Sequence, residues 1–204
     1  MDTYGQGPQQ CTRYQKSIVP IGGHKEDGDW FMGTGLWLDA STPLILAPDH
    51  GGVNHDEWMV TTDPRVSCRV LSNAPEHSIL LEPVSEVEIG SPITPGECQM
   101  GVSLGAPVFT LGFSGWTGVG TAQIRHGVVS TVNENPSLYC VDTFTPQCNS
   151  GGPVWLAKSG HFIGTVQTLY TTKLRGGGED DSEVQQSLTG FAPCEDFIPE
   201  MKNI

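Results

Sequence analysis

The sequence Cys148-Asn149-Ser150-Gly151-Gly152-Pro153 is the most informative stretch of this chain. It sets one serine directly before two glycines and a proline, which is typical of a tight turn. Glycine adopts backbone conformations that other residues avoid, so such a turn leaves a serine hydroxyl clear of the main chain. A nucleophilic serine needs this exposure, and it needs N–H groups directed at the place where an oxyanion forms. Ser150 is therefore a candidate nucleophile, although the same residues also suit an ordinary loop.

A serine hydroxyl is a weak nucleophile at neutral pH, so it requires a base that accepts its proton and later returns it. Histidine suits this role because its charge changes near neutral pH. Among the six histidines, His50 closely follows the apolar run Leu44–Ala47, where a predicted strand gives way to a loop. His55 lies further along that loop and is the weaker candidate. We expect His50 to be the base.

Strand-sized apolar runs recur between turn residues, which favours an antiparallel barrel or sandwich over a βαβ fold. No segment of helical length carries a helical period. Residues 172–186 predict a solvated loop. We predict strands at Ser17–Gly22, Gly33–Leu38, Leu44–Ala47, Trp58–Thr61, Val66–Leu71, Ser78–Leu81, Pro107–Gly112, Thr121–Thr131, Ser137–Asp142, Pro153–Ala157, His161–Thr168 and Ser187–Ala192.

The chain divides into an arm and two halves. Residues 1–16 are polar and rich in glycine and glutamine, and they predict a flexible N-terminal arm. The polar segment Pro83–Glu97 contains several prolines and predicts a link between two halves, residues 17–90 and residues 91–204. Residues 193–201 predict a short closing helix.

The formal net charge of −13 argues against a nucleic-acid or membrane-surface partner, because both need clustered Lys and Arg. No apolar run reaches the length of a membrane span. The N-terminus lacks the basic start and apolar stretch of a secretory signal. The six cysteines follow no disulfide or zinc-binding spacing. We expect a cytoplasmic protein with free thiols and no metal or cofactor, either whole or accompanied by further domains of a longer chain.

Several stretches in order resemble the trypsin-like serine protease superfamily, nearest to its HtrA/Deg branch, without the PDZ module, and to compact viral relatives. The matching stretches are Gly33–Leu36, Leu44–His50, Gly105–Gly112, His126–Ser130, Pro146–Pro153, Phe162–Val166 and Gly190–Pro193. Ordered agreement over about residues 17–201 is more specific than any single motif. The resemblance implies a chymotrypsin-like double β-barrel with a short C-terminal helix. It places the active site between the barrels, with His50 on one barrel and Ser150 on the other.

The third member of the triad departs from the family pattern. Pro75–Leu81 matches the strand that an aspartate opens in this family, and here His77 stands at that position. A neutral histidine orients His50 without supplying a compensating charge. Glu76 has the charge, but it should point away because side chains alternate along a strand. By register His77 is the first candidate for the third member. Glu76 is the second, and a Ser–His pair without a third member or an inert site also stays open.

The second departure is Cys148, which stands where the family usually has glycine. The resemblance implies that the backbone N–H groups of Cys148 and Ser150 form the oxyanion hole. A Cβ at this position disfavours the backbone turn that the hole needs, so we expect the hole to assemble when substrate binds. Cys148 is the less favoured nucleophile, because the two glycines follow Ser150.

By family register, the primary specificity pocket has Phe144 and Thr145 at its base and Gln167, Thr168 and Leu169 on the opposite wall. None of these residues is acidic, so the resemblance implies cleavage after apolar or small residues, or else a pocket that Phe144 partly plugs. The implied activity is that of a serine endopeptidase, which cleaves a protein or peptide substrate through an acyl-enzyme. The alternative is a catalytically silent protease-like domain that binds peptides or partners, because the triad aspartate and the oxyanion glycine are both replaced.

Overall fold

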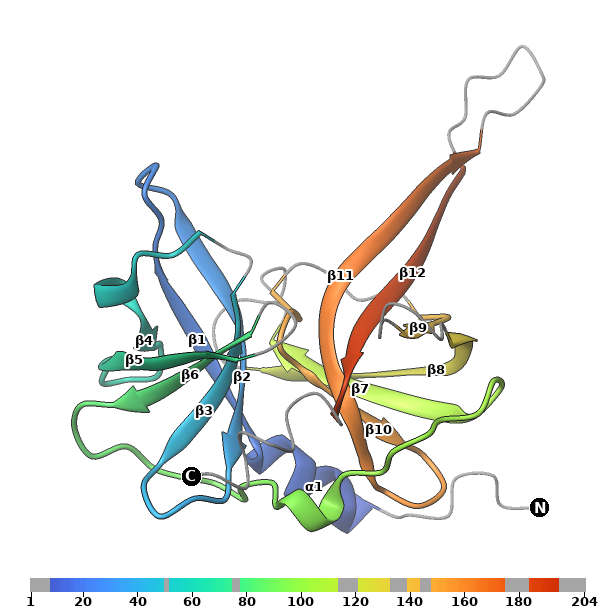
Figure 1. Cartoon of the computed structure of the whole chain (residues 1–204), viewed down its shortest axis with the longest axis horizontal. Helices are drawn as coiled ribbons and strands as arrows, with labels where there is room; N and C mark the ends of the chain where they lie inside the picture. The colour runs from blue at the N-terminus through green and yellow to red at the C-terminus, as the bar shows by residue number, and fades with distance from the viewer. Residues whose placement is uncertain are drawn as a thin grey trace.

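The computed structural model describes residues 8–49, 52–74, 78–113, 121–132, 139–143, 148–174 and 184–194. These residues form two closed barrels of six strands each (Figure 1), and every pair of neighbouring strands is antiparallel. The predicted all-β double barrel is confirmed.

The first barrel has the strand order β1-β2-β3-β6-β5-β4 and the second has the order β10-β11-β12-β9-β8-β7. The strands of the first barrel are β1 (Ile18–His24), β2 (Trp30–Leu38), β3 (Leu44–Pro48), β4 (Met59–Val60), β5 (Val66–Ala74) and β6 (Ser78–Pro83). The strands of the second barrel are β7 (Pro107–Phe113), β8 (Ala122–Val132), β9 (Tyr139–Val141), β10 (Pro153–Leu156), β11 (Phe162–Leu174) and β12 (Val184–Pro193). Two short 3-10 helices, η1 (His55–Glu57) and η2 (Pro95–Glu97), lie in the connections.

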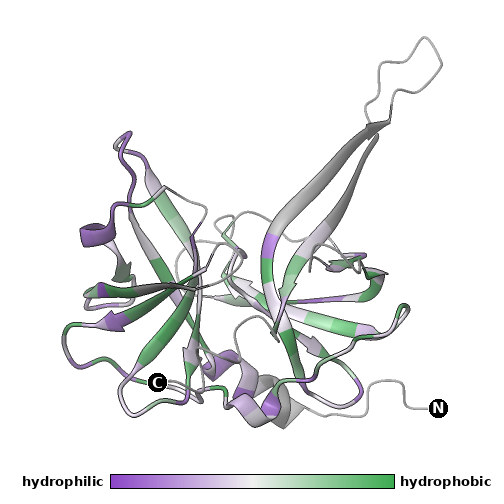
Figure 2. Cartoon of the chain, viewed as in Figure 1, coloured by the Kyte–Doolittle hydropathy of each residue, from purple (hydrophilic) through white to green (hydrophobic). Residues whose placement is uncertain are grey.

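The strand β3 and the part of β2 from Gly33 onward are buried on both faces, and β3 is apolar along its length (Figure 2). Successive side chains of a strand point to opposite faces of the sheet. Trp37 and Ile45 therefore pack inside the first barrel. Leu36 and Leu46 belong instead to a cluster that also contains Trp155 of the second barrel. This shared cluster holds the two barrels together, since each fully buried leucine contributes about 1.5–3 kcal/mol.

The N-terminal residues differ from the sequence expectation, because Pro8–Lys16 form the helix α1 rather than a flexible arm. Proline suits the first turn of a helix, and the basic residues Arg13 and Lys16 suit its last turn. Tyr14 is the buried anchor at 4% exposure, with its ring 4.4 Å from that of Trp155. Of the helix side chains that are described, those of residues 12–16, Tyr14 is the buried one, and a single apolar anchor gives this stretch no helical period.

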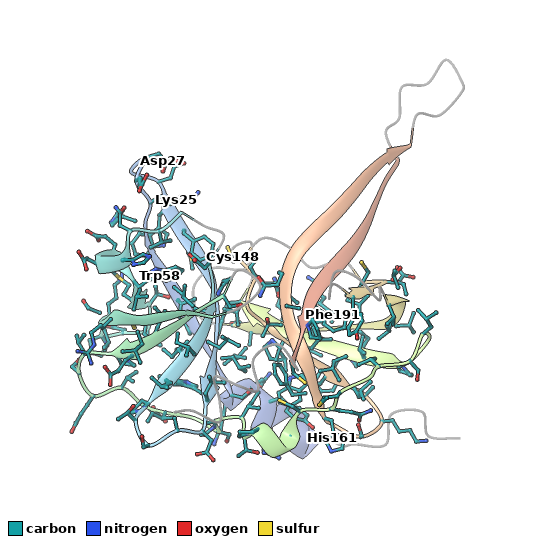
Figure 3. The ribbon with its side chains drawn as sticks, viewed as in Figure 1. Lys25, Asp27, Trp58, Cys148, His161 and Phe191 are labelled. Atoms are coloured by element: carbon teal, nitrogen blue, oxygen red, sulfur yellow. The ribbon has the colours of Figure 1, made fainter. Side chains whose placement is uncertain are left out.

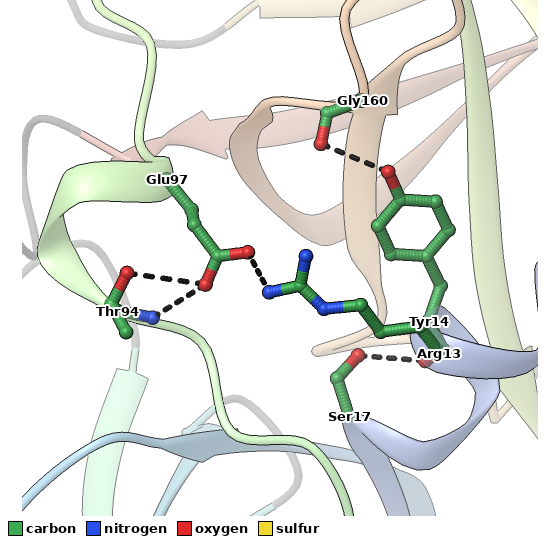
Figure 4. A network of polar contacts seen from close by, with 6 residues as sticks. All are labelled: Arg13, Tyr14, Ser17, Thr94, Glu97 and Gly160. Carbon is green, nitrogen blue, oxygen red and sulfur yellow. Dashed lines mark hydrogen bonds and ion pairs between the residues drawn. The ribbon is translucent and has the colours of Figure 1, made fainter. Parts of the chain in front are cut away.

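Polar contacts fix α1 to the segment between the barrels (Figure 4). Arg13 forms an ion pair with Glu97, whose carboxylate also accepts a hydrogen bond from the backbone N–H of Thr94. The Tyr14 hydroxyl donates to the carbonyl of Gly160 at 3.1 Å. Within the predicted link over residues 83–97, Ile93 forms a β-bridge with Leu38 of the first barrel. Cys98, directly after the link, forms a β-bridge with Phe162 of the second barrel.

The strands β11 and β12 are longer than the sequence predicts, and together they extend past the rest of the second barrel (Figure 1). Their pairing continues to Leu174 and Val184, inside the segment predicted as a loop. The predicted closing helix over 193–201 falls outside the described residues from 195 onward. Among the residues that are described, no helix has the length and apolar character needed to cross a membrane.

Candidate active site

The turn that carries Ser150 has the shape that its two glycines allow. Gly151 has a φ of +84°, and a Cβ built there would overlap the carbonyl oxygen of Thr34 and lie 2.6 Å from Cδ of Pro48. A Cβ on Gly152 would overlap the carbonyl oxygen of Leu111. The turn is thus wedged between the two barrels, and no side chain larger than hydrogen fits at either position. The tight turn expected from the sequence is present.

Hydrogen bonds hold this turn from both sides. On the second barrel, the Gly151 N–H donates to the Val166 carbonyl at 2.7 Å, and the Val166 N–H donates to the Gly152 carbonyl at 2.8 Å. On the first barrel, the Thr34 N–H donates to the Ser150 carbonyl at 2.8 Å, and the Thr34 hydroxyl donates to the Cys148 carbonyl at 3.0 Å. The backbone on both sides of the Ser150 side chain is therefore fixed.

Cys148 adopts a φ of +75°, the left-handed region that favours glycine. It is the one non-glycine residue with positive φ in the described part of the chain. Figure 3 shows Cys148 between the two barrels. A cysteine pays a steric cost for this conformation of about 1–2 kcal/mol. The Cys148 backbone therefore occupies the conformation that its Cβ disfavours, and the expected assembly of the oxyanion hole stays a prediction.

His50, Glu76 and His77 lie outside the described residues, so the predicted triad stays a prediction. The described chain beside them nevertheless converges on the Ser150 turn. Pro48, two positions before His50, lies against Gly151. Pro48 is also the register partner of Ser78, which directly follows His77.

Gln167 joins the second barrel to the first at this place. Its Nε2 donates to Ser78 Oγ and to Thr165 Oγ1, both at 3.1 Å. Gln167 lies at a break in the β11–β12 register between Val166 and Thr168. Such a bulge re-aims a side chain, and here it accompanies a glutamine that reaches the other barrel.

The predicted specificity pocket is only partly described. Phe144 and Thr145 lie outside the described residues, and only the backbone of Thr168 and Leu169 is described, paired with Gly190 and Thr189 of β12. Gln167, the third predicted wall residue, is 8% exposed. Its amide nitrogen is used in bonds within the protein, and its Oε1 has no hydrogen-bond partner among the described residues.

Sequence reasoning missed Thr34 and Ser78 as parts of this site. Each had a signal, since Thr34 lies inside the quoted Gly33–Leu36 stretch and Ser78 directly follows the predicted third triad position. What the sequence lacks is the spatial information that both hydroxyls face the second barrel. Thr34 is bonded to Cys148, and Ser78 is bonded to Gln167.

Among the described residues, the thiols with a shifted pKa belong to Cys68, Cys98 and Cys140, and none of these residues is part of the Ser150 turn. Burial raises the pKa of Cys68, in the core of the first barrel, to about 11. A pocket of about 700 Å³ also lies elsewhere, on the first barrel. Among the described residues, its lining includes Pro20, Thr62 and Glu88 but not Cys148, Ser150 or Gln167. Neither feature supplies chemistry to Ser150.

No protein-family model matches the sequence, and a search by sequence found no similar curated protein. Solved structures match the fold at low sequence identity. The Rv3671c protease from M. tuberculosis in its active form is 18% identical, with a TM-score of 0.67, and the match covers 96% of this chain and 83% of that one.

Two further matches come from other proteases. The HtrA-type protease AlgW with a tripeptide is 16% identical with a TM-score of 0.69, over 96% of this chain and 62% of that chain. The MamO protease domain from Magnetospirillum magneticum is 16% identical with a TM-score of 0.64, over 92% and 97%. The chain therefore has the chymotrypsin-like double-barrel fold of HtrA-type serine proteases.

Proposed function

We propose that this protein is a serine endopeptidase that cleaves peptide bonds through an acyl-enzyme. The observation that carries the proposal is the Ser150 turn, wedged between two barrels and bonded to both. The chain that precedes His50 and the chain that follows His77 meet at this turn, through Pro48 and Ser78.

In the proposed reaction, the Ser150 Oγ attacks the carbonyl carbon of the substrate while His50 accepts the hydroxyl proton. The N–H groups of Cys148 and Ser150 stabilise the negative charge on the carbonyl oxygen. His50 then gives its proton to the leaving amine, and water hydrolyses the acyl-enzyme by the reverse sequence. His77, or else Glu76, orients His50. No metal or cofactor takes part in these steps.

The substrate we propose is a protein or peptide cut after an apolar or small residue. The AlgW structure, solved with a tripeptide, supports a peptide as the ligand of this fold. We also propose a cytoplasmic location, supported by the five cysteines whose side chains are described, since none of these five forms a disulfide.

Labelling with a fluorophosphonate probe tests the activity directly. We expect an adduct on Ser150 that Ser150→Ala and His50→Ala abolish. Ser159→Ala is the matched control, because Ser159 is an exposed serine in the turn after β10. An adduct that survives His50→Ala would reject His50 as the base.

A second candidate is a protease-like domain that binds peptides without cleaving them. The histidine at position 77 and the cysteine at position 148 favour it, because both replace residues that the family uses in catalysis. Absence of any adduct on Ser150 in folded protein, together with saturable binding of a peptide that stays intact, would favour this candidate over the endopeptidase.

A further inference from the structure

Thr34 contacts the Ser150 turn with both its backbone and its side chain, although it belongs to the opposite barrel. Its N–H donates to the Ser150 carbonyl at 2.8 Å, and its hydroxyl donates to the Cys148 carbonyl at 3.0 Å. Thr34 is 0% exposed. Two carbonyls, one on each side of Asn149, are thus held by a single buried residue.

A third hydrogen bond fixes the direction of the Thr34 hydroxyl. The backbone N–H of Phe113, at the end of β7, donates to Thr34 Oγ1 at 3.0 Å. A threonine hydroxyl carries one proton and accepts through its lone pairs. Because Phe113 donates into the oxygen, the single hydroxyl proton is left for the Cys148 carbonyl.

The bond to Cys148 acts on a residue in an unfavourable conformation. At a φ of +75° the Cβ of Cys148 disfavours the backbone that it occupies. Strained backbone persists where the surrounding structure over-determines it. The Thr34 hydroxyl supplies such a constraint on the carbonyl side of Cys148, because a change in the Cys148 backbone that moves this carbonyl would break a buried hydrogen bond.

We propose that Thr34 is a positioning residue, whose hydroxyl holds Cys148 in its left-handed conformation and so keeps the oxyanion hole formed before substrate arrives. The inference rests on the proposed function, and it assigns the task to this chain's own combination of Thr34 and Cys148. A glycine at position 148 needs no such restraint. The effect of removing the Thr34 hydroxyl should therefore depend on whether position 148 carries a side chain.

The test measures the rate of fluorophosphonate labelling in Thr34→Val, which removes the hydroxyl and keeps the shape and the backbone bond. We expect labelling about 10–100-fold slower, less than the loss of a whole oxyanion-hole donor. Thr34→Ser, which restores the hydroxyl, should label within about threefold of the wild type. With a peptide substrate, the loss should fall on kcat rather than on KM, because the ground-state contacts of the substrate are unchanged.

The Cys148→Gly background is the decisive comparison. There, Thr34→Val should slow labelling by no more than about threefold, because glycine holds the conformation unaided. An equal loss in both backgrounds, or unchanged labelling in Thr34→Val, would overturn the inference. Thr110→Val is the matched control, since Thr110 is a 1% exposed threonine of β7 whose Oγ1 has no partner among the described residues. It should label as the wild type does.

Amide hydrogen exchange separates this inference from the proposed function. In Thr34→Val, but not in Thr34→Ser, the peptides that contain Phe113 and residues 148–152 should exchange faster. If the wild type forms no adduct and this exchange pattern appears, the endopeptidase fails and the restraint on the turn stands. If exchange is unchanged, the restraint fails whatever the activity. Should Thr34→Val fold poorly, Thr34→Ala in the wild-type and in the Cys148→Gly backgrounds gives the same comparison.

Discussion

The Nε2 of Gln167 lies 3.1 Å from the Oγ of Ser78 and donates a hydrogen bond to it across the boundary between the two barrels. Both side chains are buried, at 8% and 1% exposure. Because Ser78 directly follows His77 in sequence, this bond ties β11 to the chain beside the predicted third triad residue. It sets the position of the two barrels at the place where the proposed reaction needs them aligned.

Loss of this bond should weaken the contact between the barrels. Gln167→Ala should lower the free energy of unfolding by about 1–3 kcal/mol, since it removes a buried bond and leaves buried hydroxyls unpaired. Urea denaturation measures the change. A double-mutant cycle with Ser78→Ala should give a coupling energy of about 0.5–1.5 kcal/mol. Strictly additive losses would show that the two side chains do not interact.

The space around Gly151 should make it irreplaceable. Gly151→Ala adds a Cβ at a φ of +84° and against the Thr34 carbonyl, so it should abolish labelling and cost more than about 2 kcal/mol of stability. Gly28→Ala is the control, because Gly28 has a φ of +86° with nothing within 4 Å of the added Cβ. It should cost about 1 kcal/mol and leave labelling intact. Thermal unfolding measures the stability of the two variants, and probe labelling measures their reactivity. Equal losses of stability in the two variants would show that the positive φ, and not the contact with Thr34, causes the loss.

The residue at position 77 should govern the rate of the reaction. His77→Asp restores the carboxylate that stabilises a protonated base, so labelling should rise by up to about 10⁴-fold. Glu76→Gln should leave the rate within about threefold of the wild type if His77 is the orienting residue. A large loss in Glu76→Gln, with no gain in His77→Asp, would assign the role to Glu76. The rate constants of fluorophosphonate labelling in the two variants measure these effects.

The cysteines should differ in their reactivity. A hydrogen bond from Cys194 lowers the pKa of Cys98, whereas burial raises the pKa of Cys68 to about 11 and also raises that of Cys140. A lower pKa means more thiolate at neutral pH, and the thiolate is the reactive form. Iodoacetamide should therefore modify Cys98 before Cys68 and Cys140, as peptide mass spectrometry can follow. Cys194→Ala, which removes the donor, should slow the modification of Cys98, and an unchanged rate would show that the hydrogen bond does not control it.

Much of the fold could be predicted because the strands carry strong local signals. The run Leu44–Ala47 becomes β3 (Leu44–Pro48), and the run that starts at Pro153 becomes β10 (Pro153–Leu156). The helix α1 escaped prediction because its stability comes from Tyr14 packing on Trp155, a contact between residues far apart in sequence. The ends of β11 and β12 escaped for a related reason. Their polar residues read as a loop, and their pairing with each other is what makes them strands.

The sequence by itself determined the succession of strands along the chain, the small residues of the Ser150 turn and the choice of Ser150 and His50 as candidates, whereas His77 came from the family resemblance. These properties depend on residue type and on near neighbours, which the sequence displays directly. Only the tertiary structure decided that Thr34 holds Cys148 and that Gln167 reaches Ser78. Both contacts join the two barrels, and their geometry follows from barrel closure and packing rather than from any local pattern.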